Sequence, residues 1–300
     1  MEAHDTNIGE MGYVKPSRSK NYMLLRKAVR WFVASTMYYS GVVFLYSLFS
    51  KRPRARILVY HSISEDPLNP FSVSPEDFEE QVRFLSQEYN VISLEELIAC
   101  IIDKGREIPP DSVVITFDDG FKDNYIHAYP VLVKYGVPAT IFVITERLEP
   151  SGAPQFAAKD QESGLYLSWD QIIEMSRNGV SIGSHTCTHP WLTDVTLEEA
   201  RREIVESKAC LEQQLDEPVC LFAYPGGRIR DFDQNIISIV ASSGYSGACI
   251  GLNGTNTDGI SPYLLRRTKI EVGDSMYVFK KALKGALDIF VLLDYTRRFS

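Results

Sequence analysis

A short run of β-branched and aromatic residues that ends in two acids constrains this chain more than any other feature. Residues 112–117 read Ser-Val-Val-Ile-Thr-Phe, and Asp118, Asp119 and Gly120 follow directly. Such a run is typical of a strand that is buried on both faces, as in a parallel sheet. Because successive strand side chains point to opposite sides, we expect the two acids to have different roles, such as one metal ligand and one base. Taken alone, Asp-Asp-Gly would more often indicate a turn.

Similar strand-like runs alternate with helix-like segments through the rest of the chain. The expected strands lie at 56–60, 91–92, 112–117, 139–143, 180–184, 219–223, 248–250 and 264–270. Helices are expected after Ser74, at 94–102, at 124–135, after Ser168, after the capping pair Thr196 and Glu199, and around 236–240. Strict alternation predicts a parallel sheet. The absence of a Gly-x-Gly-x-x-Gly turn favours a closed or nearly closed β/α barrel over a dinucleotide-binding fold.

Polar residues stand at the C-terminal ends of the expected strands. They are His61, Asp118, Asp119, His185 and Tyr224. Barrels of alternating strands and helices place their catalytic residues at this face, because the loops that follow the strands converge there. The sequence therefore predicts one site built from several strand ends.

Two histidines four residues apart indicate a metal site. Residues 184–190 read Ser-His-Thr-Cys-Thr-His-Pro and directly follow an expected strand. His185 and His189, together with one carboxylate, can form a three-ligand site with an open position for water. Imidazole and carboxylate ligands suit Zn²⁺, and Fe, Mn, Co and Ni accept the same ligand types. Cys187 has the wrong spacing to bind the same ion and is expected to be a small packed residue.

The two motifs together resemble a known family. Thr116-Phe117-Asp118-Asp119-Gly120 and the segment 184–190 are similar to the first two motifs of the polysaccharide deacetylases, the NodB-homology domains of carbohydrate esterase family 4. Residues 60–63, Tyr-His-Ser-Ile, and 222–227, Phe-Ala-Tyr-Pro-Gly-Gly, further resemble the branch that deacetylates poly-N-acetylglucosamine. The resemblance covers about residues 56–270. It implies a distorted (β/α)7 barrel that hydrolyses N-acetyl groups of N-acetylglucosamine-type polysaccharides or oligosaccharides.

The resemblance also implies roles for individual residues. Asp119, His185 and His189 would bind a divalent metal, with Zn²⁺ expected, and Asp118 would be the base. Tyr224, Pro225 and Gly226 would contact the substrate, with the backbone N–H of Gly226 stabilising the oxyanion.

The sequence departs from the family pattern at two positions. Many members supply the general acid from a late Leu-x-His motif, and no His follows His189 in this chain. His61 is the candidate acid, weighed equally against a structural role. The family's Arg before the third motif is replaced by Ala223, so Arg266 or Arg267 is expected to hold the base, with Lys269 as another cation near that edge.

Three other functions remain open at this point. One is deacylation of a different C–N bond, as in a lipid-linked sugar or a small amide. Another is carbohydrate binding without catalysis, which the missing late His makes worth considering. A non-haem iron oxygenase also uses two His and a carboxylate, but the parallel β/α pattern disfavours it.

The N-terminal part of the chain differs from the rest in charge. Residues 1–56 hold ten Lys and Arg against three acids, about +7, and the remainder holds twenty-one against thirty-six, about −15, which together make the net −8. An acidic body argues against nucleic acid as a partner. Five Cys without Cys-x-x-Cys indicate no disulfide framework.

An uncharged segment lies between two basic flanks in this N-terminal part. Residues 31–49 carry no charge and are long enough for a hydrocarbon core of about 30 Å, so residues 31–50 are predicted to be a membrane anchor. An amphipathic helix in the membrane interface is the competing interpretation. Because both flanks are basic, their charge does not indicate the orientation of the anchor in the membrane. The barrel is expected on the extracytoplasmic side from its predicted function alone.

The predicted organisation has four parts. Residues 1–30 are a disordered basic N-terminus, 31–50 the anchor, 56–275 the barrel, and 276–300 an amphipathic basic helix that packs across the barrel's outside. The sequence indicates no oligomeric state.

Overall fold

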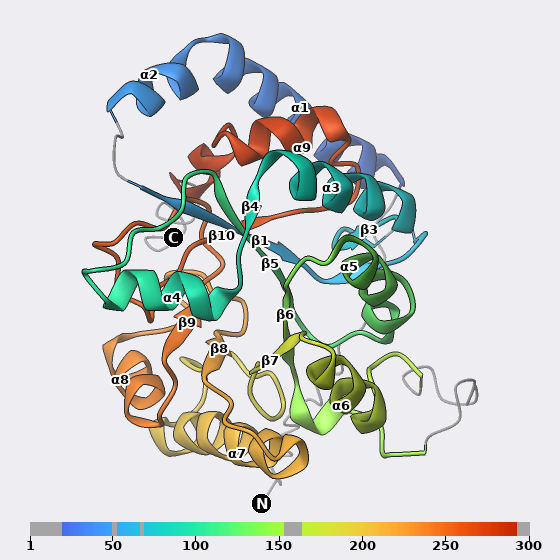
Figure 1. Cartoon of the computed structure of the whole chain (residues 1–300), viewed down its shortest axis with the longest axis vertical. Helices are drawn as coiled ribbons and strands as arrows, with labels where there is room; N and C mark the ends of the chain where they lie inside the picture. Colours follow the sequence, from blue (N-terminus) through green and yellow to red (C-terminus); the bar gives the residue numbers. More distant parts are fainter. Residues whose placement is uncertain (1–19, 50–52, 67–68, 153–163, 293–300) are drawn as a thin grey trace, which may run out of the picture.

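The computed structural model describes residues 20–49, 53–66, 69–152 and 164–292 (Figure 1). The part of the predicted disordered N-terminus at 1–19 lies outside the described residues. So do residues 153–163 and the last eight residues of the predicted C-terminal helix.

Seven parallel strands form the nearly closed barrel that the sequence predicts (Figure 1). Around the barrel they follow the order β10 (Arg267–Lys269), β1 (Ala55–Tyr60), β5 (Ser112–Phe117), β6 (Thr140–Val143), β7 (Ser181–Ser184), β8 (Leu221–Ala223) and β9 (Gly247–Cys249). A parallel bridge between Cys249 and Leu265 brings the segment before β10 beside β9. Among the described residues, the short strand β4 (Asn90–Val91) pairs with β5 outside this order, and β2 (Ser62–Ile63) pairs with β3 (Ser72–Val73).

The strands β1 and β5 place the first candidate residues side by side. Both are buried over their whole length, which is why they read as continuous apolar runs. Tyr60 pairs with Phe117, and the N–H of Asp118 donates to the carbonyl of Tyr60 at 3.0 Å. Because the two strands end in register, His61 and Asp118 leave the sheet at the same level.

Helices cover the outside of the barrel, and their starts follow the predicted caps. They are α3 (Pro75–Glu88), α4 (Leu94–Ile102), α5 (Tyr129–Tyr135), α6 (Trp169–Arg177), α7 (Leu197–Leu215), α8 (Gln234–Ser242) and α9 (Met276–Leu283). The side chains of Ser74, Ser168 and Thr196 each accept from the backbone N–H three residues on. A π-helical turn, Asn124–Ala128, precedes α5, so the helix expected at 124–135 is divided into two parts just before Pro130.

The N-terminal segment forms two helices and does not match the predicted division at residue 30. Helix α1 (Lys20–Tyr39) runs through that boundary, and Gly41, with φ of +80°, separates it from α2 (Val42–Phe49). Within the described part of the chain, no helix is both long and apolar enough to cross a membrane. The expectation of one spanning anchor is therefore unsupported. A left-handed glycine breaks the apolar run into two shorter pieces.

The C-terminal helix is shorter than predicted. Helix α9 ends at Leu283, and Gly285, with φ of +95°, turns the chain into a short 3-10 turn, Asp288–Phe290. The expected packing is present, because Val278, Phe279 and Ala282 are buried and α9 contacts α1 and α3. In Figure 1, α9 lies between α1 and the barrel.

Candidate metal centre and active site

The ends of two strands bring three of the predicted ligands together. Asp119 follows β5, and His185 follows β7, with β6 between them. The N–H of His185 donates to the carbonyl of Val143, the last residue of β6, at 2.9 Å. Asp119 and His185 are buried, at 5% and 2% exposure, and His189 is half-buried.

The three side chains have the separations of a metal site. Oδ1 of Asp119 lies 3.6 Å from Nε2 of His185 and 3.6 Å from Nε2 of His189, and one donor atom of each lies within 4.8 Å of the others. Donor atoms bound to one tetrahedral Zn²⁺ at about 2.0–2.2 Å are roughly 3.4 Å apart. One carboxylate with two imidazoles therefore fits a divalent cation such as Zn²⁺ in both chemistry and spacing.

The protein fixes the tautomer of His185. Its Nδ1 lies 2.7 Å from the carbonyl oxygen of Ala223, at the end of β8. A carbonyl oxygen can only accept, so Nδ1 carries the proton and Nε2 presents its lone pair to Asp119. Ala223, which stands where the family has another residue, thus contributes its backbone to the site.

Burial sets the charge states of the three groups. Desolvation lowers the pKa of His185 and of His189 to about 4, so both rings are neutral at pH 7, the form that binds a metal. Desolvation also raises the pKa of Asp119, against the opposing effect of His61 and His185. A buried carboxylate beside two neutral imidazoles is stabilised when a cation binds between them.

The backbone at the site is left-handed at three residues other than glycine. The φ angles are +73° at Asp119, +69° at Thr186 and +68° at His189. Each costs roughly 1–2 kcal/mol relative to an ordinary conformation. Gly120 continues the turn at +74°, where an added Cβ would lie 3.0 Å from Cγ1 of Val143. The strained residues are thus candidate ligands or lie next to one, and the strain is confined to the positions that orient these side chains.

A glutamate on α7 holds the loop that carries the two histidines. Oε2 of Glu203 accepts from the backbone N–H of Cys187 at 2.8 Å and of Thr188 at 2.9 Å, and Oε1 accepts from Oγ1 of Thr188 at 2.8 Å. Oγ1 of Thr186 accepts from the N–H of His189 at 3.0 Å. These bonds stabilise the left-handed conformations. As predicted, Cys187 is a packed residue, 7% exposed.

Arg267, rather than Arg266, holds Asp118. Its Nη1 and Nη2 donate to the two carboxylate oxygens at 2.6 and 2.8 Å. Burial alone would raise the pKa of Asp118, but the guanidinium of Arg267, with His185 and His61, outweighs it and holds that pKa well below its usual range. The backbone of Arg266 instead pairs with the Asn256 side chain. Successive strand residues alternate, so only one of the two can face Asp118.

His61 lies beyond the end of β1, beside the carboxylates. Its ring stacks on Phe71 with the centroids 5.1 Å apart. Burial lowers the pKa of His61, and the charges of Asp119 and Asp118 oppose that shift. Burial also lowers the pKa of Lys269, which feels the charge of Asp118 as well. The predicted acid and the neighbouring cation are both placed near the base.

The segment 224–226 presents backbone rather than side chains. The ring of Tyr224 is 1% exposed and packs against Phe222 and Phe232 in the core. Gly226 is exposed, with φ of +68°, and an added Cβ there would lie 2.5 Å from Oδ2 of Asp231. A glycine is therefore required at the position that the family uses for the oxyanion.

The sequence reasoning missed three residues around the site. Arg147 lies four residues beyond β6, donates to the hydroxyl of Tyr166 at 3.1 Å, and its charge acts on Asp119 and His189. Trp191 is 45% exposed, and its Nε1 is 3.3 Å from the point where a Cβ on Gly226 would lie. Glu203 is the third. Position after a strand end could have indicated Arg147, whereas nothing in the sequence links Glu203 to the histidine loop.

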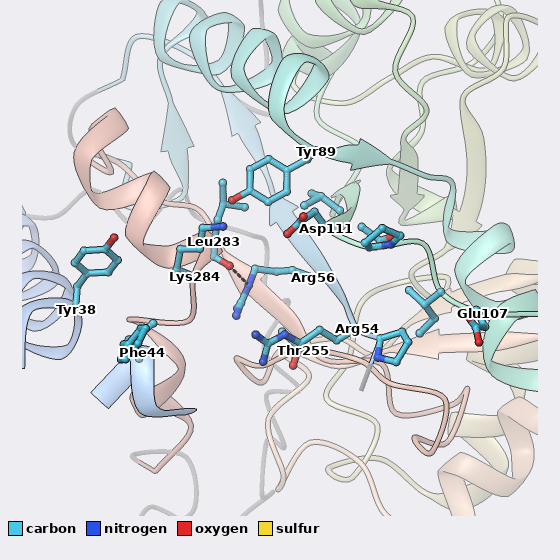
Figure 2. Close-up of a pocket in the computed structure, with 16 residues that line it drawn as sticks. Tyr38, Phe44, Arg54, Arg56, Tyr89, Glu107, Asp111, Thr255, Leu283 and Lys284 are labelled. Atoms are coloured by element: carbon cyan, nitrogen blue, oxygen red, sulfur yellow. Dashed lines mark hydrogen bonds between the residues drawn. The ribbon is translucent and has the colours of Figure 1, made fainter. Parts of the chain in front are cut away.

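A cavity elsewhere in the molecule is separate from this site. It has a volume of about 770 Å³, and none of the predicted site residues lines it (Figure 2). Its walls include Arg54 and Arg56 at the start of β1 and Asp111 just before β5, so it lies at the opposite end of the barrel. Tyr38 and Phe44, from α1 and α2, flank it in Figure 2.

Comparison with known proteins matches this geometry to one family. The sequence profile described as polysaccharide deacetylase matches residues 105–248. YxkH of Bacillus subtilis (strain 168), named as a polysaccharide deacetylase, is 30% identical over 230 residues, 76% of each chain. A poly-beta-1,6-N-acetyl-D-glucosamine N-deacetylase of Staphylococcus epidermidis is 31% identical over 201 residues, which is 59% of this chain and 66% of that protein.

A solved structure shows the same architecture. The Streptococcus pyogenes deacetylase PplD in complex with acetate aligns with a TM-score of 0.67 and 28% identity, and covers 78% of this chain and 99% of that one. Together with the parallel barrel and the motifs at its strand ends, these similarities show that the chain is a hydrolase of carbon–nitrogen bonds that belongs to the polysaccharide deacetylase family.

Proposed function

We propose that this protein is a metal-dependent N-deacetylase of N-acetylglucosamine-type polysaccharides or oligosaccharides. The observation that carries the proposal is the convergence of Asp119, His185 and His189 on one point beside Asp118. The relatives named as poly-beta-1,6-N-acetyl-D-glucosamine N-deacetylases support the substrate class. With such a substrate, the barrel would act on the extracytoplasmic side of a membrane.

Asp119, His185 and His189 would hold the cation. When bound, a divalent metal such as Zn²⁺ polarises an amide carbonyl and makes a neighbouring water more acidic. The Nδ1 bond of His185 to Ala223 and the bonds of Glu203 keep the ligands in place before the metal arrives. With these supports, metal binding would require little rearrangement of the site.

Asp118 would take the proton from the attacking water. Arg267 keeps this carboxylate ionised and holds both of its oxygens in one orientation. Each carboxylate oxygen has a second lone pair, so Asp118 can accept a proton while it stays bonded to Arg267. The backbone N–H of Gly226 would donate to the oxyanion of the tetrahedral adduct.

His61 would return a proton to the departing amine. Burial lowers its pKa, so the resting ring is neutral at pH 7 and must first be protonated during the reaction. Its position at the level of Asp118 places it beside the group that gains a proton when water attacks. The reaction would end with a free amine on the sugar and acetate.

The test is acetate release by the full-length chain. The protein is stripped with a chelator, reloaded with Zn²⁺ or another divalent metal, and incubated with N-acetylglucosamine oligomers while acetate is measured. Release that depends on the metal is expected, and Asp118→Asn should lower kcat about 10²–10⁴-fold while the bound metal stays at the parent level.

Two results would contradict the proposal. Acetate release that is equal with and without metal would remove the metal centre from the reaction. Oligomers that bind the loaded protein and are never hydrolysed would instead favour a carbohydrate-binding protein without catalysis. Asp111→Asn, an exposed acid at the other end of β5, is the matched control and should leave release unchanged.

A further inference from the structure

Helix α1 is oriented with its charges toward the protein and its apolar side chains toward solvent. Arg30 is 8% exposed and donates to both carboxylate oxygens of Asp274. Arg26 donates to both oxygens of Glu271, at 2.9 and 2.6 Å. The stem of Lys27 lies over Gly273, where an added Cβ would contact it at 2.4 Å. Arg26, Lys27 and Arg30 are thus directed at the segment that follows β10.

The opposite side of α1 is apolar and exposed. Leu25, Val29 and Phe32, at spacings of four and three residues, are 64%, 44% and 64% exposed. The remaining positions of this stripe are Ala28 and Thr36, so it carries no charge. A surface helix of a soluble protein normally has the reverse arrangement.

Helix α2 continues the same surface. It reads Val-Val-Phe-Leu-Tyr-Ser-Leu-Phe, and its residues Phe44 and Leu45 are 63% and 53% exposed. Val43 and Phe44 also border the cavity of Figure 2, so the protein side of α2 does not pack into the barrel core at this point. A helix that is apolar on all sides is normally buried in a core or in lipid. We call Leu25, Val29, Phe32 and Leu45 the outer face.

The charge around the outer face identifies its partner. Between Glu10 and Glu65 the sequence contains ten Lys and Arg and no acid, whereas the rest of the chain is strongly acidic. Arg26, Arg30 and Arg56 are paired with acids of the protein itself, so an excess of seven positive charges remains for a partner. Lys280 and Lys284 of the adjoining α9 region are exposed as well. Anionic lipid headgroups complement such a basic border, and acyl chains complement the apolar stripe. In a two-fold dimer formed through this face, each basic border would meet the same border of the other copy, and the like charges would repel.

We propose that the outer face docks in the plane of a membrane that contains anionic phospholipid. Helices α1 and α2 lie in the membrane interface. The ion pairs of Arg26 and Arg30 attach the barrel to the side of α1 that faces away from the lipid. Glu271 and Asp274 follow β10 at the end of the barrel that bears the metal centre. The first half of α1 therefore lies at the catalytic end of the barrel, whereas α2 borders the cavity at the opposite end. The proposal is independent of the substrate assigned above.

Vesicle co-sedimentation of the full-length chain tests the proposal. One set of vesicles contains phosphatidylcholine alone, and the other contains equal parts of phosphatidylcholine and phosphatidylglycerol. The parent is expected to sediment with the anionic vesicles, and less so with the neutral ones or at high salt. The double variant Leu25→Glu with Phe32→Glu should lower the partition coefficient at least about tenfold.

A matched double variant controls for surface charge. Val133→Glu with Leu197→Glu places the same charges at apolar residues that are 59% and 51% exposed on α5 and α7, and it should sediment like the parent. Urea unfolding midpoints equal to that of the parent would show that both double variants are folded, because all four side chains are largely in solvent.

Three outcomes would overturn the proposal. They are a parent that does not sediment with anionic vesicles, an outer-face variant that binds as well as the parent, and equal binding to neutral vesicles. Light scattering without lipid tests whether a second copy of the chain binds the outer face instead. A parent dimer that the outer-face variant dissociates, without vesicle binding by either, would make the outer face a contact between copies instead.

Discussion

Arg267 donates to both carboxylate oxygens of Asp118 although the two residues are 149 positions apart in the sequence. Both are nearly inaccessible, at 2% and 5% exposure, so the pair forms a buried ion pair at the barrel mouth. Such a pair fixes the orientation of the Asp118 carboxylate, and loss of Arg267 would leave an unpaired buried charge. The Arg of the family's third motif is absent here, and an Arg from the last strand takes that place.

Arg267→Met should lower both stability and rate. Removing the guanidinium leaves Asp118 buried without its partner, which costs about 3–5 kcal/mol of unfolding free energy, and kcat for acetate release should fall about 10–100-fold as the base loses its orientation. Urea unfolding and acetate release measure the two effects. Arg266→Met is the control at the adjacent position and should be close to the parent. Equal effects of the two variants would refute the assignment.

Glu203→Ala should weaken metal binding although Glu203 is not a ligand. It leaves the N–H groups of Cys187 and Thr188 without their acceptor, and the strained loop relaxes. We expect metal affinity to fall about 10–100-fold, measured by competition with a chelating dye, and Glu203→Gln to recover part of it. Glu206→Ala, an exposed acid on the same helix, should bind metal normally. Unchanged affinity in Glu203→Ala would show that the loop keeps its shape without this residue.

Trp191→Ala should affect long substrates more than short ones. An exposed indole beside Gly226 offers a flat apolar surface on which a sugar ring adjacent to the reacting one can stack. KM for an N-acetylglucosamine oligomer should rise about tenfold with kcat nearly unchanged, and KM for a short substrate should hardly change. Leu197→Ala removes another exposed apolar side chain and should leave both constants as they are. A uniform loss with all substrates would point to a structural role.

His61→Gln distinguishes the general acid from a structural histidine. If the ring protonates the leaving amine, kcat should fall about 10²-fold with KM nearly unchanged, and one ionisation should disappear from the pH profile of kcat. Loss of the stack on Phe71 alone would lower stability and leave the profile intact. Rate profiles and thermal unfolding of the same preparations separate the two outcomes, and an unaltered profile would exclude the acid role.

The ion pair between Arg26 and Glu271 should make the packing of α1 against the barrel less stable at acid pH. Burial raises the pKa of Glu271, but Arg30 and Arg26 outweigh it, so the pKa in the folded state lies below the ordinary value. A carboxylate with a depressed pKa contributes stability above its unfolded pKa and loses that contribution as the pH falls through its folded pKa.

Arg26→Gln tests this pH dependence. The parent should exceed this variant by about 1–2 kcal/mol of unfolding free energy at pH 7, and the difference should shrink below about pH 4.3, where glutamate in the unfolded chain becomes protonated. Urea unfolding across this pH range is the measurement. Lys27→Gln removes the same charge from the next residue, and its difference from the parent should vary less with pH. A difference for Arg26→Gln that stays constant from pH 7 to acid would contradict the prediction.

Local features of the sequence were sufficient to predict the barrel. Buried parallel strands require continuous apolar runs, and caps such as Ser74, Ser168 and Thr196 act on the backbone three residues away. Both effects operate over a few residues, so β5, α4 and α7 could be located without any knowledge of their neighbours. Asp119 and His185 directly follow strands, and His189 is four residues beyond His185, so the group that the structure brings together could be predicted from the sequence for the same reason.

Only the tertiary structure decided which distant groups meet. The choice of Arg267 over Arg266 depends on which side of β10 faces Asp118, and the role of Glu203 depends on how α7 packs beneath the histidine loop. The direction of α1 is a further case. The sequence predicts an anchor at residues 31–50, but the helix begins at Lys20, and its Arg26 and Arg30 are turned toward the barrel by Glu271 and Asp274. Pairings across more than two hundred residues are set by packing geometry, which local sequence patterns do not contain.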